Sequence, residues 1–204
     1  FFDENGKILG EEYTQVFCSD FVLSKNKGNT VSTLSSSNAL KDLTESYGGN
    51  YFFTPVGEMN VVKKMKEVNS IVGGEGGGGI IYPELHYGRD ALVGIVLFLG
   101  LLVNKDCKVS DLKSNYPVYF MKKLKVLLKD DKIIDKIFID ITNKYSDLSP
   151  NTDDGVRIDF EDGWVHMRKS NTEPIVRIFS ESKDQENADN LAIKIQKEIL
   201  LLGG

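Results

Sequence analysis

Apolar positions between residues 30 and 80 follow two alternating spacings. Short runs of apolar and β-branched residues, typical of strands, occur at 30–34, 51–54 and 70–72. Between these runs, apolar residues recur every three or four positions, as on one face of a helix: Ala39, Leu40, Leu43 and Tyr47, then Val61, Val62, Met65 and Val68. Strand, helix, strand, helix and strand in this order predict a parallel sheet covered by helices.

The segment from Ala91 to Val103 contains no polar side chain. It is shorter than the roughly 20 residues that a membrane span needs, so a helix within a folded domain is favoured over a membrane-spanning one. A helix that is apolar on every side is expected at the buried centre of its domain. Asp90 stands at its start, where a negative charge complements the helix dipole.

Residues 104–117 are polar and mixed, as is typical of a boundary between domains. Beyond them, residues 119–128 fit either a helix or a strand. Four lysines in and after this segment are interpreted as one solvated face: Lys122, Lys123, Lys125 and Lys129. The next segment, 133–145, favours a helix because its apolar residues recur at helical spacing: Ile134, Ile137, Phe138 and Ile141.

Strict alternation at 156–160, a turn, and further strands at 164–168 and 175–179 predict an antiparallel sheet. A capping box from Ser182 to Gln185 predicts a last helix. The inward positions of that helix would be Ala188, Leu191, Ile195, Ile199 and Leu202. The fold class is therefore α/β, with one parallel-sheet α/β domain followed by an α+β domain with an antiparallel sheet.

Composition narrows the class of protein. The chain has 204 residues, of which 41% are hydrophobic, enough for a packed core, and a net charge of −5 gives no reason to expect nucleic acid or a membrane as a partner. Its two cysteines, Cys18 and Cys107, are far apart, which argues against a disulfide framework or a cysteine zinc site and makes a reducing cytoplasm the expected compartment. The chain opens at Phe1 in what reads as the middle of a hairpin, without a signal peptide, so we expect a piece of a longer protein.

The strongest local signal is a short polar loop bracketed by Arg168 and Arg177. Between them stand hydroxyl and amide donors, Ser170, Asn171 and Thr172. A phosphate dianion is well matched by guanidinium forks with hydroxyl and backbone donors. The alternative is a plain hairpin loop in which Glu173 pairs with an arginine and a hydroxyl caps the turn.

A glycine tract at residues 73–79 is the second signal. It joins two apolar strands within one α/β domain, and ligands bind where parallel strands end. Glu75 is the only residue of the tract with a functional side chain. Its carboxylate can accept hydrogen bonds from the paired hydroxyl groups of a sugar. The alternative is a flexible linker. A Walker A loop is excluded because the required Lys-Ser or Lys-Thr is absent.

The other candidates favour structural roles. His86 and His166 lie far from each other in sequence, with no nucleophile nearby, so neither is expected to be catalytic. The polar run 33–38 fits an anion at a helix N-terminus, but N-capping explains it equally well. The acidic pairs at 153–154 and 161–162 read as turns rather than calcium loops.

Taken in order, these motifs resemble the α-D-phosphohexomutases. The resemblance rests on Gly74-Glu75, Ile81-Tyr82-Pro83, Gly88-Arg89-Asp90-Ala91, Asp154-Gly155-Val156, Trp164-Val165, Arg168, Ser170-Asn171-Thr172-Glu173-Pro174 and Arg177. It covers nearly the whole chain. It implies that residues 1–12 end a preceding domain, 13–113 form a sugar-binding α/β domain, and 114–204 form a phosphate-binding α+β domain.

Enzymes of this family interconvert hexose 6-phosphates and hexose 1-phosphates. A phosphoserine donates its phosphoryl group to form a hexose 1,6-bisphosphate, the intermediate and activator, with Mg²⁺ balancing charge. The resemblance implies that Glu75, with Gly74, Gly76 and Gly77, binds the sugar. It also implies that the non-reacting phosphate is held by Arg168, Ser170, Asn171, Thr172 and Arg177.

Two departures from the family pattern bear on function. The sugar loop has Gly77 and Gly79 where many relatives carry polar side chains, so sugar identity rests on Glu75 and backbone groups. The phosphoserine and metal loops belong to missing amino-terminal domains, the expected partners of this chain, which predicts no catalytic residue, no bound metal and no mutase activity in the chain alone. Prokaryotic phosphoglucosamine mutases resemble it most, phosphomannomutase or phosphoglucomutase being the alternative. A non-catalytic phosphosugar-binding module is the alternative of another class.

Overall fold

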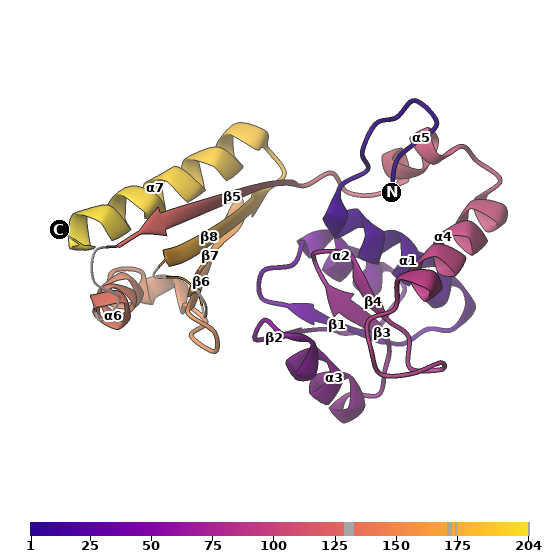
Figure 1. Cartoon of the computed structure of the whole chain (residues 1–204), viewed down its shortest axis with the longest axis horizontal. Coiled ribbons are helices and arrows are strands. Elements are labelled where there is room, and N and C mark those ends of the chain that lie inside the picture. Colours follow the sequence, from indigo (N-terminus) through magenta and orange to yellow (C-terminus); the bar gives the residue numbers. More distant parts are fainter. Residues whose placement is uncertain (129–132, 171–172, 174, 204) are drawn as a thin grey trace. The chain divides into compact units, whose positions relative to one another are not determined.

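The computed structural model describes residues 1–128, 133–170, 173 and 175–203. The chain forms two compact units, residues 1–118 and 119–204, each described here by itself (Figure 1).

The first unit is built on a four-stranded sheet in the order β2-β1-β3-β4. The strands are β1 Asn29–Thr33, β2 Tyr51–Thr54, β3 Ser70–Glu75 and β4 Gly79–Ile81. Strand β1 runs parallel to both β2 and β3, while β4 is antiparallel to β3 and closes the edge. The predicted α/β class with parallel strands is confirmed, with one antiparallel strand added.

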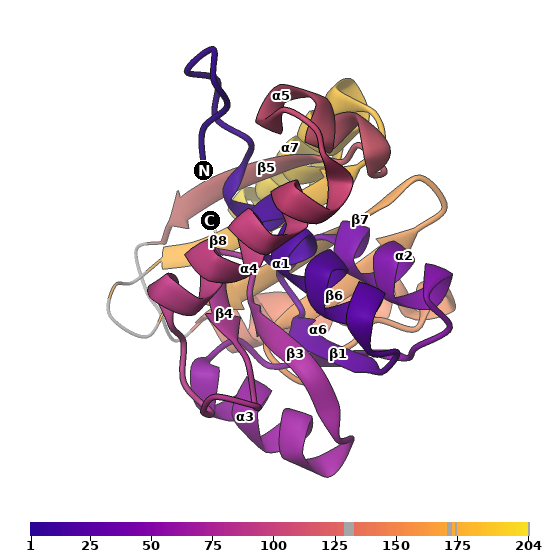
Figure 2. The same ribbon diagram turned by 90° about the vertical axis from the view of Figure 1, so that its right-hand side faces the viewer.

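Helices cover both faces of this sheet (Figure 2). They are α1 Glu11–Lys25, α2 Asn38–Ser46, α3 Glu58–Glu67, α4 Ala91–Lys105 and the short α5 Val109–Leu112, which runs into a 3₁₀ turn at Lys113–Asn115. Helix α3 lies on one face, where Val61 and Met65 pack with Val31 of β1 and Ile81 of β4. The opposite face carries α1, α2 and α4.

The prediction that Ala91–Val103 is a helix is confirmed, but its predicted burial is wrong. Five apolar side chains of α4 are exposed, by 44% to 81%: Leu92, Ile95, Val96, Leu99 and Val103. The buried helix is instead α1, which we did not predict. None of the described helices is long and apolar enough to cross a membrane.

Helix α1 is buried although it carries polar residues, because those residues find partners. Asp20 accepts hydrogen bonds from the hydroxyls of Tyr47 and Tyr116, at 2.6 and 2.5 Å, and lies 3.2 Å from Lys105 Nζ. Gln15 Oε1 accepts a hydrogen bond from the Ser32 hydroxyl. Burial of such groups costs little once they are hydrogen-bonded.

The first residues form the hairpin expected from the sequence, reduced to a single antiparallel bridge between Phe2 and Ile8. The ring of Phe1 stacks on that of Phe98 in α4, with centroids 3.9 Å apart.

The second unit contains an antiparallel sheet in the order β5-β8-β7-β6. Its strands are β5 Phe120–Leu127, β6 Val156–Phe160, β7 Gly163–Lys169 and β8 Ile175–Ser182. The segment 119–128, left open between helix and strand, is therefore a strand. The predicted antiparallel sheet is confirmed.

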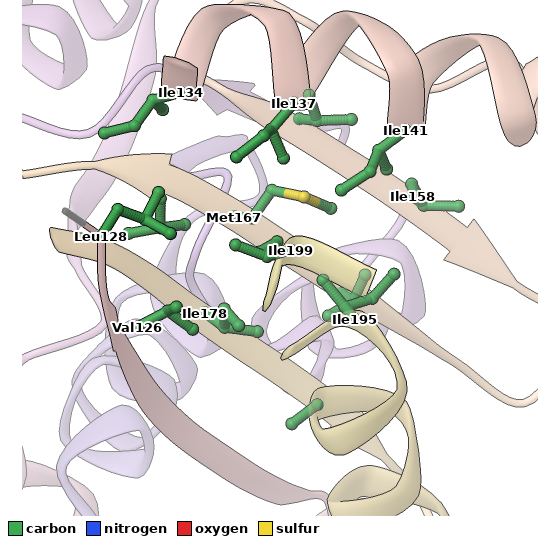
Figure 3. Packing of buried hydrophobic residues seen from close by; sticks show 14 residues of the cluster. Val126, Leu128, Ile134, Ile137, Ile141, Ile158, Met167, Ile178, Ile195 and Ile199 are labelled. Atoms are coloured by element: carbon green, nitrogen blue, oxygen red, sulfur yellow. The ribbon is translucent and has the colours of Figure 1, made fainter. Parts of the chain in front are cut away.

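Two helices, α6 Ile134–Lys144 and α7 Gln185–Gly203, cover one face of this sheet, and a 3₁₀ turn at Ser146–Leu148 follows α6. Figure 3 shows isoleucines of both helices meeting the strands, Ile137 and Ile141 from α6, Ile195 and Ile199 from α7. Because successive strand residues alternate between faces, the residues between the core positions are directed to the other face.

Three local predictions in this unit need correction. The four lysines do not share one face, because side chains alternate along β5. Lys122 Nζ lies 3.3 Å from Asp189 Oδ1 of α7, whereas Lys123 and Lys125 lie on the opposite face of the strand. Lys129 is outside the described residues.

The last helix is capped by Asp184, whose carboxylate accepts a hydrogen bond from the Asn187 amide. A capping box centred on Ser182 is therefore wrong, and Leu202 is 46% exposed rather than turned inward.

Candidate functional site

The carboxyl ends of the three parallel strands bring three loops together at one edge of the first sheet. Two hydrogen bonds link these loops: the amide of Gly76 donates to Ser36 Oγ at 3.1 Å, and the amide of Gly57 donates to Glu75 Oε1 at 3.1 Å. The predicted ligand loop therefore lies at the edge where open α/β sheets bind ligands. It forms the turn of the β3–β4 hairpin, closed by the Gly78 amide donating to the Glu75 carbonyl.

Glu75 is held by charge as well as by the backbone. Its Oε2 lies 2.8 Å from Arg89 Nη1, and its side chain is 16% exposed. Arg89 Nε in turn lies 2.9 Å from Glu58 Oε2, and the hydrogen bond between them lowers the pKa of Glu58. A carboxylate held in this way is an acceptor for hydroxyl donors.

The three glycines predicted to accompany Glu75 have different surroundings. A Cβ on Gly74 would lie 2.0 Å from the carbonyl oxygen of Gly79 across the hairpin, and one on Gly76 would collide with the Glu12 carboxylate. A Cβ on Gly77 would meet nothing within 4 Å. The loop is thus tightly packed beneath Gly74 and Gly76 and open at Gly77.

The polar run 33–38 lies beside this loop and caps a helix, as the structural alternative predicted. Ser37 is the N-cap of α2, and its hydroxyl accepts a hydrogen bond from the Ala39 amide at 3.1 Å. The Ser37 amide donates to Glu12 Oε2. The run thereby joins α1 and α2 to the glycine loop.

In the second unit, Arg168 of β7 stands directly opposite Arg177 of β8, and Lys125 of β5 stands opposite Arg177 on its other side. Residues opposite one another in an antiparallel sheet share a face. Three cationic side chains therefore form a row on the face away from α6 and α7. Like charges in such positions repel each other, so the row is a favourable place for an anion.

A carboxylate lies near each of the two arginines. Arg168 Nε lies 3.3 Å from Asp154 Oδ2, without making a hydrogen bond to any described residue. Arg177 Nη2 lies 3.7 Å from Glu173 Oε2, which is the arginine–glutamate pair of the hairpin alternative. Since both of the latter side chains are more than a third exposed, that pair contributes little to stability.

Ser170 lies at the base of the loop between Arg168 and Arg177. It is buried, and its amide donates to the Ile175 carbonyl at 3.0 Å. Asn171 and Thr172 lie outside the described residues, so their predicted contacts with phosphate stay predictions.

The two histidines differ in environment. His166 is fully buried next to the cationic row, with Nε2 2.6 Å from the Asp154 carbonyl, and burial lowers its pKa to about 4. It is therefore neutral near pH 7 and holds the segment that carries Asp154. His86 lies 3.1 Å from Asp90 at the surface.

Within the described ranges no three histidine, cysteine or carboxylate residues are grouped as a metal site would require.

Sequence reasoning did not assign to either site several residues that the structure brings there. Glu12, Glu58 and Arg89 surround the glycine loop, and Lys125 extends the arginine pair. These residues could be linked to the two sites only through the order and pairing of the helices and strands. Glu58 begins α3, Arg89 directly precedes the N-cap of α4, and Lys125 reaches the arginine pair only once β5 is assigned as a strand.

An α/β unit with a carboxylate-bearing loop at its sheet edge, followed by an antiparallel unit with an arginine-bracketed hairpin, is the architecture expected for the carboxy-terminal half of a phosphohexomutase. The chain belongs to the phosphoglucomutase/phosphomannomutase family. Residues 10–119 match its alpha/beta/alpha domain III, and residues 107–198 match its C-terminal domain.

Curated relatives agree with this assignment. The chain is 35% identical to a phosphoglucomutase/phosphomannomutase of Thermococcus kodakarensis over 98% of its own length and 45% of the relative's. It is 33% identical to a phosphoglucosamine/phosphogalactosamine mutase of Sulfurisphaera tokodaii over 97% of its own length and 44% of the relative's. The chain thus spans less than half the length of these relatives.

Solved structures share the fold. A phosphoglucomutase/phosphomannomutase family protein from Burkholderia thailandensis superposes with a TM-score of 0.79 at 22% identity, covering 97% of this chain and 43% of that one. An N-acetylphosphoglucosamine mutase of Aspergillus fumigatus, solved with GlcNAc-6P and magnesium, gives 0.72 at 16% identity, over 100% of this chain and 46% of that one.

Proposed function

We propose that this chain is the carboxy-terminal, substrate-holding half of a phosphohexomutase that interconverts hexose 6-phosphate and hexose 1-phosphate through a bisphosphorylated intermediate. In this proposal Glu75, with the backbone of Gly74, Gly76 and Gly77, binds sugar hydroxyls. The non-reacting phosphate is bound by Arg168, Ser170 and Arg177, with Asn171 and Thr172 completing the site. A firm anchor at one end of the sugar positions the other end for reaction.

The observation that carries the proposal is the cationic row formed by Lys125, Arg177 and Arg168. Arg168 and Arg177 bracket a hairpin loop, and the buried Ser170 lies at the base of that loop. A phosphate dianion relieves the repulsion within the row and accepts charge-assisted hydrogen bonds worth about 1.5–3 kcal/mol each.

Titration of arginine variants tests this anchor. Arg168→Ala and Arg177→Ala are each expected to weaken glucose 6-phosphate binding by roughly tenfold or more, since each removes at least one charge-assisted bond. Lys197→Ala is the matched control, because Lys197 is exposed on α7, which covers the other face of the sheet. Unchanged affinity in both arginine variants would establish the plain hairpin alternative.

The preferred sugar is the finer part of the proposal. We infer glucosamine phosphate, with mannose or glucose phosphates as the alternative, and the names of the relatives include both kinds. Comparing turnover of the three sugar phosphates by the complete protein decides this point. A preference for the neutral sugars overturns the first choice.

A non-catalytic phosphosugar-binding module is the candidate of another class. It predicts that the complete protein binds hexose phosphates without turning them over. The length of the relatives, more than twice that of this chain, favours the mutase.

Catalysis in the complete protein would use Mg²⁺ to balance charge on the phosphoryl group. The described residues offer no grouping that fits such an ion, so no step within this chain is assigned to it. The contribution of this half is binding and orientation.

A further inference from the structure

Arg89 joins three segments of the first unit through its side chain and backbone. Its Nη1 lies 2.8 Å from Oε2 of Glu75, at the end of β3, and its Nε lies 2.9 Å from Oε2 of Glu58, at the start of α3. Its amide also donates to Glu58 Oε1 at 3.3 Å. One guanidinium is therefore shared by two carboxylates at the edge of the sheet that carries the glycine loop.

The glycine loop makes room for this arrangement. A Cβ on Gly79 would lie 2.4 Å from Arg89 Cδ and 3.1 Å from Arg89 Cγ. The hydrocarbon part of Arg89 thus crosses the last residue of the loop and fills the space that a side chain at position 79 would need. Arg89 reaches Glu75 because residue 79 is glycine.

The geometry limits how Glu75 can turn. Its Oε2 accepts from Arg89 and its Oε1 accepts from the Gly57 amide, so both oxygens have one fixed donor. A carboxylate oxygen accepts about two hydrogen bonds, which leaves one acceptor direction on each oxygen for a ligand. Two acceptor directions on one fixed carboxylate match a pair of neighbouring hydroxyl groups.

We propose that Arg89 is a positioning residue that fixes the Glu75 carboxylate for a pair of sugar hydroxyls, with Glu58 holding Arg89 in place. The inference rests on the proposed function, because it requires Glu75 to bind the sugar. The alternative is an ion pair that only ties α3, β3 and the start of α4 together. Arg89 is about half exposed, and an exposed pair of that kind adds little to stability.

The test compares two ligands on the same 204-residue chain by NMR titration, glucose 6-phosphate and inorganic phosphate. Arg89→Met and Glu75→Gln are each expected to weaken glucose 6-phosphate binding about fivefold, the loss of one ordinary hydrogen bond, while inorganic phosphate binding stays unchanged. Arg89→Lys, which restores a cation beside Glu75, is expected to recover most of the affinity. A merely structural role predicts a lower melting temperature without this difference between ligands.

A matched control is Lys64→Met, which removes the partly exposed Lys64–Glu67 ion pair on the same helix as Glu58 and should change neither affinity. Glu58→Gln, which leaves the contact between Arg89 and Glu75 in place, should weaken glucose 6-phosphate about twofold and carries the test if Arg89→Met does not fold. If Glu75→Gln weakens glucose 6-phosphate and neither Arg89→Met nor Glu58→Gln does, Arg89 has no positioning role and the proposed function stands. If Glu75→Gln has no effect either, the sugar-binding role of Glu75 fails and this inference fails with it.

Discussion

His166 is a fully buried titratable side chain beside the cationic row, and its effect on stability has a definite sign. Its pKa in the folded protein is about 4, because burial disfavours the charged imidazolium, whereas an unfolded histidine titrates near 6.5. At pH 7 both states are neutral. As the pH falls below about 6.5, the unfolded chain binds a proton that the folded chain does not, so stability decreases until about pH 4.

This linkage predicts that His166 alone lowers the free energy of unfolding by about 3 kcal/mol between pH 7 and pH 4. In His166→Gln, urea denaturation across this range should show a shallower loss than in the wild type, since glutamine does not titrate. His86→Gln is the control, because His86 lies at the surface beside Asp90. Equal pH slopes in His166→Gln and the wild type would contradict the assignment of a buried neutral imidazole.

Gly74 and Gly77 make a matched pair within the glycine loop. Gly74→Ala places a methyl group 2.0 Å from the Gly79 carbonyl oxygen, so we expect a loss of about 2–3 kcal/mol in the free energy of unfolding. Gly77→Ala meets nothing within 4 Å and is expected to change stability by less than about 1 kcal/mol. Thermal or urea unfolding of the two variants measures both values, and similar losses in the pair would contradict the packing described for the loop.

At the scale of elements, α1 and α4 show what the sequence could predict and what it could not. Helical spacing and apolar content identified α4 as a helix, but they do not say which of two adjacent helices lies inside. Helix α1 lies inside because Asp20 and Gln15 find partners on residues distant in sequence, Tyr47, Tyr116 and Ser32. Those partners follow from the tertiary fold, so the burial of α1 could not be read from its own residues.

The two sides of α4 give a direct test of its orientation. Leu101 is fully buried, and Leu101→Ala is expected to cost about 2–5 kcal/mol of the free energy of unfolding, since it leaves a cavity. Val96 and Leu99 are more than half exposed, and Val96→Lys or Leu99→Lys should stay within about 0.5 kcal/mol of the wild type. A loss of several kcal/mol in either lysine variant would mean that this face of α4 is covered.

The candidate site residues also differ in how far they could be predicted from the sequence. The arginine-bracketed hairpin and the glycine loop could be predicted because their chemistry lies in contiguous residues. Lys125 and Arg89 could not, because each reaches its site through strand register or through the position of a helix start. Residue-level chemistry was thus visible in the sequence, whereas its tertiary partners required the fold.

For the whole molecule, the proposed function assigns sugar binding to the first unit and phosphate binding to the second. Glu75 of the glycine loop belongs to the first unit, and Arg168 and Arg177 belong to the second. Two or so charge-assisted bonds of about 1.5–3 kcal/mol each support a dissociation constant on the order of millimolar for a hexose phosphate, before further domains contribute. The isolated chain is therefore expected to bind weakly.

Turnover sets a stricter requirement than binding. Rate acceleration needs groups that stabilise the transition state of phosphoryl transfer. A site that contacts only the non-reacting end of the substrate binds the ground state and the transition state equally well. We therefore expect no detectable conversion of glucose 1-phosphate or glucosamine 1-phosphate by the purified 204-residue chain, even with Mg²⁺ and hexose 1,6-bisphosphate added. The complete protein, assayed in parallel, should convert at least one of them, and Arg168→Ala in the complete protein should lower kcat/KM by about tenfold or more. Measurable turnover by the chain alone would place the reacting groups within these residues and overturn the division of labour proposed here.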